Sequence, residues 1–466
     1  MDRSQKLAEG AIPHLLLTFS VPAILGMMAQ ALYYVIDRIF VGQAIGNDAI
    51  AGTTVAFPFM LIMLAFSMLI GFGAAALISI RLGERKKAEA EQVLGNAAVL
   101  LVGVSLMLTA VGLLLLDPLL KTFGASAVVL PLARGYLRII VLGAVFQAVS
   151  FGLNAVIRGE GNPWIAMLTL LISVLLNAIL APIFLFLLHW GMPGAGLATV
   201  VSQAVAAVWV LAYFLRGRSL LKFHAKNLRL RWPICAAIMA TGSPQFAIQL
   251  TASVINIILI NQLKVYGGDL AISVWGIVWA VAMMIFMPIF GINQGAQPII
   301  GYNYGAQRFD RVKKALQTAM LAATAIAVLG FTVAMLSPAA VIRLFSRKDE
   351  YEALARVGSA ALRICMLMLP VVGFQIVGAN YFQAVGKPKQ AMFLSLSRQV
   401  FILIPAVLLL PHFFGLFGVW AAMPTADLGS VLLTAVWLTR ELQHLGRRHA
   451  ETAPETLQQP LPELLP

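Results

Sequence analysis

Long apolar stretches separated by short polar segments dominate the pattern of this chain. Twelve of them approach or exceed the roughly 20 residues that a helix needs to cross the hydrocarbon core of a bilayer. They cover about 15–42, 51–76, 93–116, 133–157, 164–187, 192–215, 236–263, 270–297, 315–336, 358–383, 391–412 and 415–439. The pattern predicts an all-α integral membrane protein with twelve transmembrane helices.

The second half of the chain repeats the first half. A gapless alignment of the two halves pairs Pro22 with Pro244, and after a short shift in register Gly161 pairs with Gly386. Each repeat holds six apolar stretches, an even number, so both repeats enter the membrane from the same side. We therefore expect two six-helix bundles related by a pseudo-two-fold axis along the membrane normal, which is typical of secondary transporters.

Polar residues mark the boundaries of these units. A basic segment with six Lys and Arg residues lies between the sixth and seventh stretches. We expect an N-terminal lobe at 1–215, a cytoplasmic linker at 216–235 and a C-terminal lobe at 236–440. The Pro-rich composition after 450 favours a cytoplasmic, disordered tail over 441–466.

Composition and charge narrow the function. Apolar residues make up 60% of the chain and charged residues 11%, too few for a water-soluble globule of this size. Cys235, Cys365 and six scattered His residues show no ligand spacing, so we expect no metal, no cofactor and no enzyme activity. The partners expected are a small-molecule substrate and the lipid bilayer, with the protein as a monomer.

The net charge of +14 is a topology signal and does not indicate nucleic-acid binding. Lys and Arg number 22 at the termini and in the loops after even-numbered helices, against seven in the loops after odd-numbered helices. By the positive-inside rule both termini are cytoplasmic, in a multi-pass protein of the bacterial plasma (inner) membrane.

Two of the 19 carboxylates lie well inside predicted helices, Asp37 in the first and Asp427 in the last. A charge there costs about 2.5–3.5 kcal/mol on insertion scales, so each needs a partner, a proton or a function. Tyr33 lies one helical turn before Asp37 and shares its face. Arg398 in the eleventh helix is within reach of Asp427, either as a structural ion pair or as part of a second coupling site.

Amides take the place of acids in the second lobe. Asn256, Gln375 and Asn380 are secondary candidates to line a cleft between the lobes. Ordinary hydrogen bonding between helices is the alternative explanation for them.

Five segments carry a family resemblance. They are ALYYVIDRIFVG, GFGAAALISIRLGERKKAEAEQVLGNA, its repeat equivalent GINQGAQPIIGYNYGAQRFDRVKKAL, RGEGNPWIAM and its counterpart QAVGKPKQAM. In this order they closely resemble the multidrug and toxic compound extrusion (MATE) family, in its MepA-like/DinF-like prokaryotic branch, over about 10–445. The resemblance implies a twelve-helix antiporter that exports amphipathic organic cations or drugs in exchange for protons or sodium.

The resemblance also implies a cation-coupling site in the N-terminal lobe. Its positions fall on Asp37, Tyr33, Asn154, Asn177, Ala181 and Thr199. The family often has a second Asp where this chain has Ala181. Sodium is held by several convergent oxygens, so the loss of one carboxylate favours protons as the coupling ion.

Two other functions remain as alternatives. The same superfamily fold moves lipid-linked or other metabolites in related proteins, but a pyrophosphate cargo needs intramembrane Arg or Lys on matching faces, which are few here. A polytopic membrane enzyme would need paired catalytic acids, a His-Asp arrangement or a metal motif near one interface.

Overall fold

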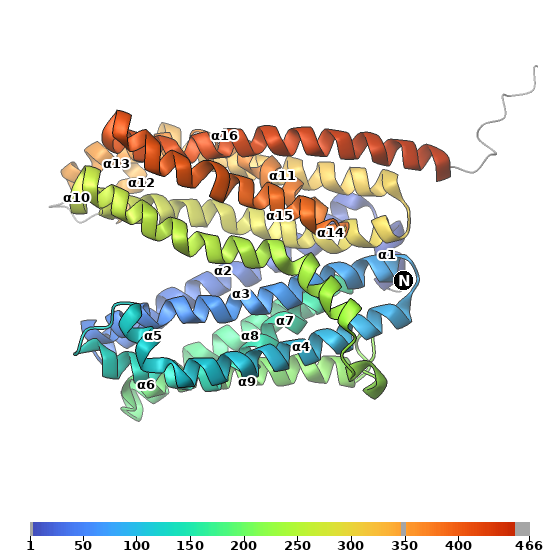
Figure 1. The fold of residues 1–466 in the computed structure, drawn as a ribbon, viewed down its shortest axis with the longest axis horizontal. Helices are drawn as coiled ribbons and strands as arrows, with labels where there is room; N and C mark the ends of the chain where they lie inside the picture. Colours follow the sequence, from blue (N-terminus) through green and yellow to red (C-terminus); the bar gives the residue numbers. More distant parts are fainter. Residues whose placement is uncertain (1–2, 346–350, 453–466) are drawn as a thin grey trace, which may run out of the picture.

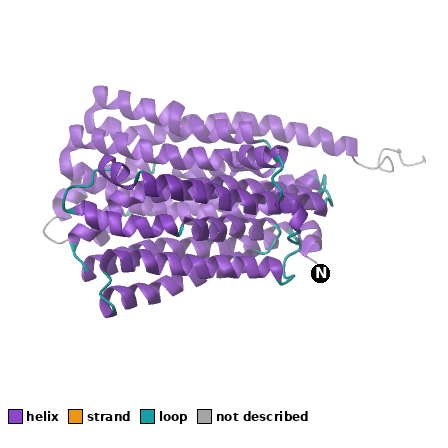
Figure 2. Ribbon diagram, turned by 60° about the horizontal axis from the view of Figure 1, so that its bottom comes forward, coloured by secondary structure: helices purple, strands orange, loops and turns teal. Residues whose placement is uncertain are grey.

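The computed structural model describes residues 3–345 and 351–452, and every regular element within these ranges is helical (Figure 2). Figure 1 shows two bundles lying side by side, with their helices running along the long axis of the molecule.

The N-terminal bundle contains nine α-helices and one π-helical segment. They are α1 (Arg3–Glu9), α2 (Ile12–Ala44), α3 (Asn47–Gly83), α4 (Lys87–Leu114), α5 (Leu116–Thr122), α6 (Val129–Leu142), α7 (Ala144–Gly159), α8 (Pro163–Pro182), the π-helix η1 (Ile183–Leu187) and α9 (Gly191–Leu215).

A linker with the short 3-10 helix η2 (Ala225–Leu228) joins this bundle to the second one. The C-terminal bundle consists of α10 (Trp232–Gly305), α11 (Phe309–Leu336), α12 (Pro338–Phe345), α13 (Tyr351–Cys365), α14 (Leu369–Ala384), α15 (Pro388–Leu396), the π-helix η3 (Ser397–Leu403) and α16 (Ile404–Thr452).

The described helices resolve into twelve membrane spans. Nine qualify by length and composition, and two bent pairs qualify when each is taken as one span: α6 with α7, bent by 54°, and α13 with α14, bent by 45°. The stretch Pro388–Leu445 has 58 residues, which is about 87 Å of straight helix and far more than the roughly 30 Å of hydrocarbon. Because its backbone breaks at Gly415, with φ of 56°, it supplies two spans. The predicted fold class is confirmed.

The backbone repeats as the sequence does. Gly46 and Gly268, which the internal repeat aligns, both have positive φ values, of 114° and 63°, and each ends a span at a sharp turn. Arg85 and Gln307, which are aligned in the same way, have φ values of 59° and 57° in equivalent turns. Non-glycine residues rarely adopt this conformation, so its occurrence at both positions shows that the two turns are copies of one structure.

The two bundles meet at one end. We call this the basic end: it holds α1, the linker and the turns at 84–86 and 306–308. A Cβ added to Gly83 would overlap the carbonyl oxygen of Tyr302, and one added to Gly305 would overlap that of Ile80. The bundles are therefore in backbone contact here, whereas their ribbons diverge towards the opposite end, the far end (Figure 1).

Two segments differ from the expected boundaries. Helix α16 continues to Thr452, so 441–452 are helical and the expectation of a disordered tail is wrong there, while 453–466 lie outside the described residues. Helix α10 begins at Trp232, within the expected linker. The remaining linker packs on the first bundle, where Asn96 Oδ1 accepts a hydrogen bond of 2.7 Å from the Arg231 backbone N–H.

Candidate functional site

A chain of hydrogen bonds joins three helices inside the N-terminal bundle. The Tyr33 hydroxyl of α2 lies 3.2 Å from Thr199 Oγ1 of α9, and Asn177 Nδ2 of α8 donates to the same oxygen at 3.2 Å. The Thr199 hydroxyl donates to the carbonyl oxygen of Ala195 at 3.3 Å. Thr199 thus accepts from Asn177 with one lone pair and from Tyr33 with the other.

The depth of this network follows from helix geometry. Thr199 is eight residues into α9, so it lies about 12 Å from the far end of that helix. The network is therefore inside the bundle, well away from the basic end, and on the side where the two bundles diverge.

Asp37 lies next to this network along α2. It comes one helical turn after Tyr33, on the same face, and only 8% of its surface is exposed. A buried carboxylate in an apolar bundle is costly when ionised, so its proton affinity responds to whatever charge approaches it.

Asn154 and Ala181 complete the predicted set, although no hydrogen bond joins either side chain to Thr199. Asn154 of α7 is 1% exposed, and its Oδ1 has no hydrogen-bond partner within the described residues. A buried acceptor without a hydrogen bond costs about 1–3 kcal/mol of stability. A ligand or proton carrier that donates a hydrogen bond to Asn154 Oδ1 would recover this cost. Ala181 is fully buried one turn after Asn177, so a methyl group occupies this position of the predicted set.

The secondary candidates lie in the C-terminal bundle and are more scattered. Asn380 accepts a hydrogen bond of 3.3 Å from Gln245 Nε2 of α10, as expected for contacts between helices. Gln375 is buried, and Asn256 is exposed on α10. The structure does not gather these three amides into one site.

Asp427 of α16 forms the ion pair that its sequence position suggested. Arg398 Nε donates to Asp427 Oδ1 at 2.6 Å, and the Asp427 side chain is 6% exposed. Arg398 belongs to the π-helical segment η3, a local widening of the helix that is frequent at functional sites.

Sequence reasoning missed a buried acid at the basic end. Glu160, just after α7, is fully buried and accepts hydrogen bonds from the hydroxyl groups of Tyr213 and Ser219. In sequence it looks like a solvated loop residue. Glu160 is enclosed by Tyr213 of α9 and by the linker, which folds back and brings Ser219 against the bundle.

A second missed feature joins the two bundles. The C-terminal bundle donates to the backbone in and after α1: Arg311 Nη2 to Gly10 O at 2.7 Å, Asn303 Nδ2 to Leu7 O at 3.2 Å and Arg308 Nη1 to Ala8 O at 2.6 Å. We call this set the α1 latch. Its residues lie about 300 positions apart, so no local pattern reveals it.

The twelve-span fold and the polar network buried in one bundle define the class of protein as a membrane transporter. A family model described as MatE matches residues 22–183 and again 244–408. The chain belongs to the MatE family. The two matched segments begin at Pro22 and Pro244, the same pair that the internal repeat aligns.

Relatives with curated names span nearly the whole chain. The multidrug export protein MepA of Staphylococcus haemolyticus (strain JCSC1435) is 26% identical over 416 residues, covering 89% of this chain and 91% of the relative. The protein of the same name from Staphylococcus aureus (strain MRSA252) is 25% identical over 425 residues, covering 91% and 93%.

Solved structures show the same fold. The MATE multidrug transporter DinF-BH, solved as a complex, is 41% identical, with a TM-score of 0.87 over 94% of this chain and 98% of that one. A MOP superfamily transporter from Pyrococcus furiosus is 24% identical, with a TM-score of 0.89 over 96% and 99%, and supports the fold alone.

Proposed function

We propose that this protein is an antiporter that exports amphipathic organic cations or drugs in exchange for protons. The observation that carries the proposal is a buried carboxylate, Asp37, one helical turn from Tyr33 of the hydrogen-bonded set Tyr33, Asn177 and Thr199. A proton needs one carboxylate and a hydrogen-bonding neighbour. Sodium needs several convergent oxygens, and Ala181 removes one of them.

Exchange follows from competition for one negative charge. Ionised Asp37 attracts a cationic substrate, and protonated Asp37 does not. A proton that arrives from the far end neutralises Asp37 and weakens binding of the cation, which leaves. Release of the proton at the other side restores the charge for the next substrate, so each transport cycle couples the two movements.

The substrate class rests on the relatives. MepA proteins are named for multidrug export, and DinF-BH is named a multidrug transporter. Helix α2 also carries exposed flexible or apolar side chains, among them Met28 and Leu32. Methionine adapts its shape to varied ligands, which suits a promiscuous site for flat apolar cations.

The orientation follows from charge. Loops at the basic end carry most of the Lys and Arg residues of the described chain, so this end faces the cytoplasm of a bacterial cell and both termini lie there. The protein then has its bundles in contact on the cytoplasmic side and apart on the outer side, a state from which substrate leaves the cell.

Efflux from vesicles tests the proposal. The purified protein is reconstituted in liposomes with a fluorescent cationic dye and given either a proton gradient alone or a sodium gradient at constant pH. We expect the proton gradient to drive dye transport and the sodium gradient to have no effect. Transport driven by sodium but not by protons would contradict the proposal.

A further inference from the structure

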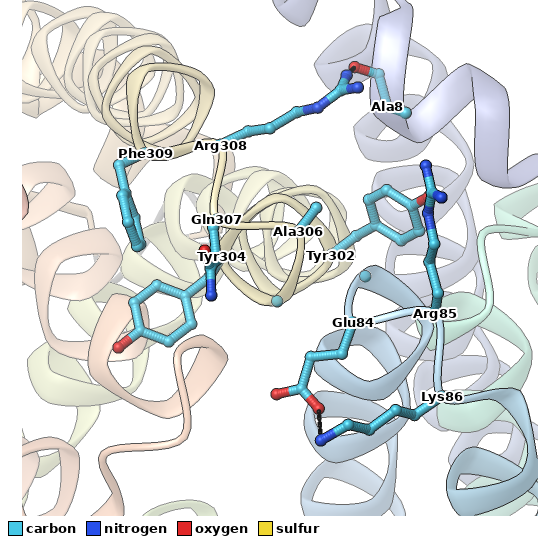
Figure 3. Close-up of a pocket in the computed structure, with 12 residues that line it drawn as sticks. Ala8, Glu84, Arg85, Lys86, Tyr302, Tyr304, Ala306, Gln307, Arg308 and Phe309 are labelled. Carbon is cyan, nitrogen blue, oxygen red and sulfur yellow. Dashed lines mark hydrogen bonds and ion pairs between the residues drawn. The ribbon is translucent and has the colours of Figure 1, made fainter. Parts of the chain in front are cut away.

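A cavity opens at the basic end where the two bundles meet. It has a volume of about 690 Å³. Its walls come from the α3–α4 turn at 83–86, the equivalent α10–α11 turn at 304–309, and Ala8 and Tyr302 (Figure 3). Neither bundle forms the cavity alone.

The cavity has a positive lining. Three basic residues, Arg85, Lys86 and Arg308, line it, and Glu84 is the one acidic residue among its described lining. Burial raises the pKa of Glu84, but hydrogen bonds from Arg81 and Lys86 outweigh it and hold that pKa below its usual value. The Glu84 carboxylate is thus ionised and already neutralised, by Arg81 at 2.7 Å and Lys86 at 3.2 Å.

Among the described residues, neither arginine of the lining forms an ion pair with an acid. The Arg85 side chain is exposed and has no hydrogen bond or ion pair within the described part of the chain. Arg308 donates to the neutral carbonyl oxygen of Ala8, which orients the guanidinium without cancelling its charge. Two positive charges therefore have no acidic partner in a cavity that lies at the membrane surface.

We propose that this cavity binds a phosphate-bearing anion, either the headgroup of an anionic phospholipid or a free phosphate. Arginine is suited to phosphate because its planar guanidinium donates two parallel hydrogen bonds. Basic pockets between transmembrane helices on the cytoplasmic side recognise lipid headgroups in this way. The first turns of α4 and α11 adjoin the cavity, but each carries an acid, Glu89 in α4 and Asp310 in α11, so the positive charge of the lining comes from its arginine and lysine side chains.

Binding of such an anion couples to the conformation of the transporter. The cavity exists only while the turns of both bundles are held together by the backbone contacts at Gly83 and Gly305. An anion that contacts both walls binds this conformation more tightly than a conformation in which the basic end is open. It therefore shifts the population towards the state described here, whatever the transported ion or substrate.

Lipid titration of the full-length protein in detergent, followed by native mass spectrometry, tests the site. The probes are phosphatidylglycerol, phosphatidylcholine and inorganic phosphate. We expect phosphatidylglycerol to bind, and Arg85→Gln to weaken it about fivefold, as for the loss of one basic contact at a membrane surface. Gln307→Arg adds a third arginine to the lining, at the repeat equivalent of Arg85, and should strengthen binding by a similar factor.

The matched control is Arg229→Gln, which removes the same charge from an exposed linker position at the same end, outside the cavity lining. If inorganic phosphate displaces phosphatidylglycerol from the wild type, and Arg85→Gln weakens phosphate binding too, free phosphate is also a ligand and the proposal holds. Equal effects of Arg85→Gln and Arg229→Gln, or equal binding of phosphatidylcholine, would overturn it. Unfolding temperatures measured without lipid establish that each variant is folded.

Discussion

Asp37 is the residue on which proton coupling depends in the proposed mechanism. Asp37→Asn removes the charge at little steric cost in a buried position of α2. We expect proton-driven efflux to be abolished while the unfolding temperature stays close to that of the wild type, because the ionisable group is lost and the packing is kept. Efflux from liposomes and thermal unfolding measure the two effects.

The matched control is Asp48→Asn, which neutralises an exposed acid at the start of α3. This variant should transport as the wild type does. Wild-type efflux by purified Asp37→Asn would mean that the coupling proton binds elsewhere.

Asp427 allows the structural and coupling roles of a buried acid to be separated. Asp427→Asn leaves the partly buried Arg398 without its ionic partner, and breaking a buried pair costs about 3–5 kcal/mol. We expect a clear fall in the unfolding temperature. The double variant Asp427→Asn/Arg398→Gln should recover most of it, since no buried charge remains.

Efflux by the double variant then decides the role of the pair. Transport at the wild-type rate indicates a structural pair. A folded double variant that has lost proton-driven efflux would place a second coupling group in the C-terminal bundle, against the single-carboxylate proposal.

Adding a carboxylate at Ala181 tests whether the missing acid is the reason for the preference for protons over sodium. Ala181→Asp adds a hard oxygen ligand and a negative charge one turn after Asn177 in α8. Sodium binding should strengthen because both changes favour a hard cation. Isothermal titration calorimetry with sodium checks this, and unchanged heats would show that position 181 is not part of a cation site. Ala178→Asp, at a neighbouring position in the same helix, controls for the added charge.

At the residue scale, the positions of side chains within single helices could be predicted from the sequence and from the family resemblance. Tyr33, Asn177 and Thr199 come together as expected because each occupies a fixed face of its helix. Glu160 was missed because its burial depends on the linker folding back over α7. Asn154 lies in the fourth span as expected, and the 54° bend of that span between α6 and α7 was not part of the prediction.

Among the elements, α1 connects the N-terminal bundle to its neighbour. The α1 latch is centred on Arg311, whose Nη2 donates to Gly10 O and whose Nε donates to Asn303 Oδ1 at 3.0 Å. Arg311→Gln removes hydrogen bonds of the charged type, each worth about 1.5–3 kcal/mol. The backbone amides of 6–12 should therefore exchange with deuterium about tenfold faster or more.

Lys313→Gln is the control for this experiment, since Lys313 is an exposed basic residue two positions along the same helix. Unchanged exchange at 6–12 in Arg311→Gln would show that packing, and not the latch, holds α1 in place.

The existence of each membrane span could be predicted, because the length of an apolar stretch alone determines whether it can cross a bilayer. All twelve spans appear because a bilayer requires about 20 apolar residues and the chain provides them between polar turns. The ends were less predictable. Residues 441–452 extend α16 although they are polar, and hydrogen bonding continues a helix beyond the apolar stretch that initiates it.

For the whole molecule, the repeat fixes the architecture but not the function. Equivalent turns such as those at Arg85 and Gln307 have matching backbones, while the buried acids differ: Asp37 lies beside a hydroxyl–amide network, and Asp427 is paired with Arg398. The sequence shows the duplication directly. It cannot show which end of the two bundles is in contact, because contacts such as that of Gly83 with Tyr302 join residues far apart in the sequence and leave no local pattern.

The glycines at the basic end are expected to determine that balance. Gly83→Ala places a methyl group against the Tyr302 carbonyl oxygen of the opposite bundle, so the contact must open or shift and the state described here becomes less favourable. Gly103→Ala is the control, because nothing lies within 4 Å of an added Cβ there. Alanine at an interior helix position is favoured over glycine by up to about 1 kcal/mol, so this variant should fold.

Double electron–electron resonance measures the separation of the two bundles at the basic end. Spin labels are attached after Lys226→Cys and Lys313→Cys, one on each side of the contact. The native Cys235 and Cys365 are buried and escape labelling. Gly83→Ala should add a longer distance to the distribution, and Gly103→Ala should leave it unchanged. Identical distributions in all three proteins would mean that close backbone packing at Gly83 does not control the opening of the basic end.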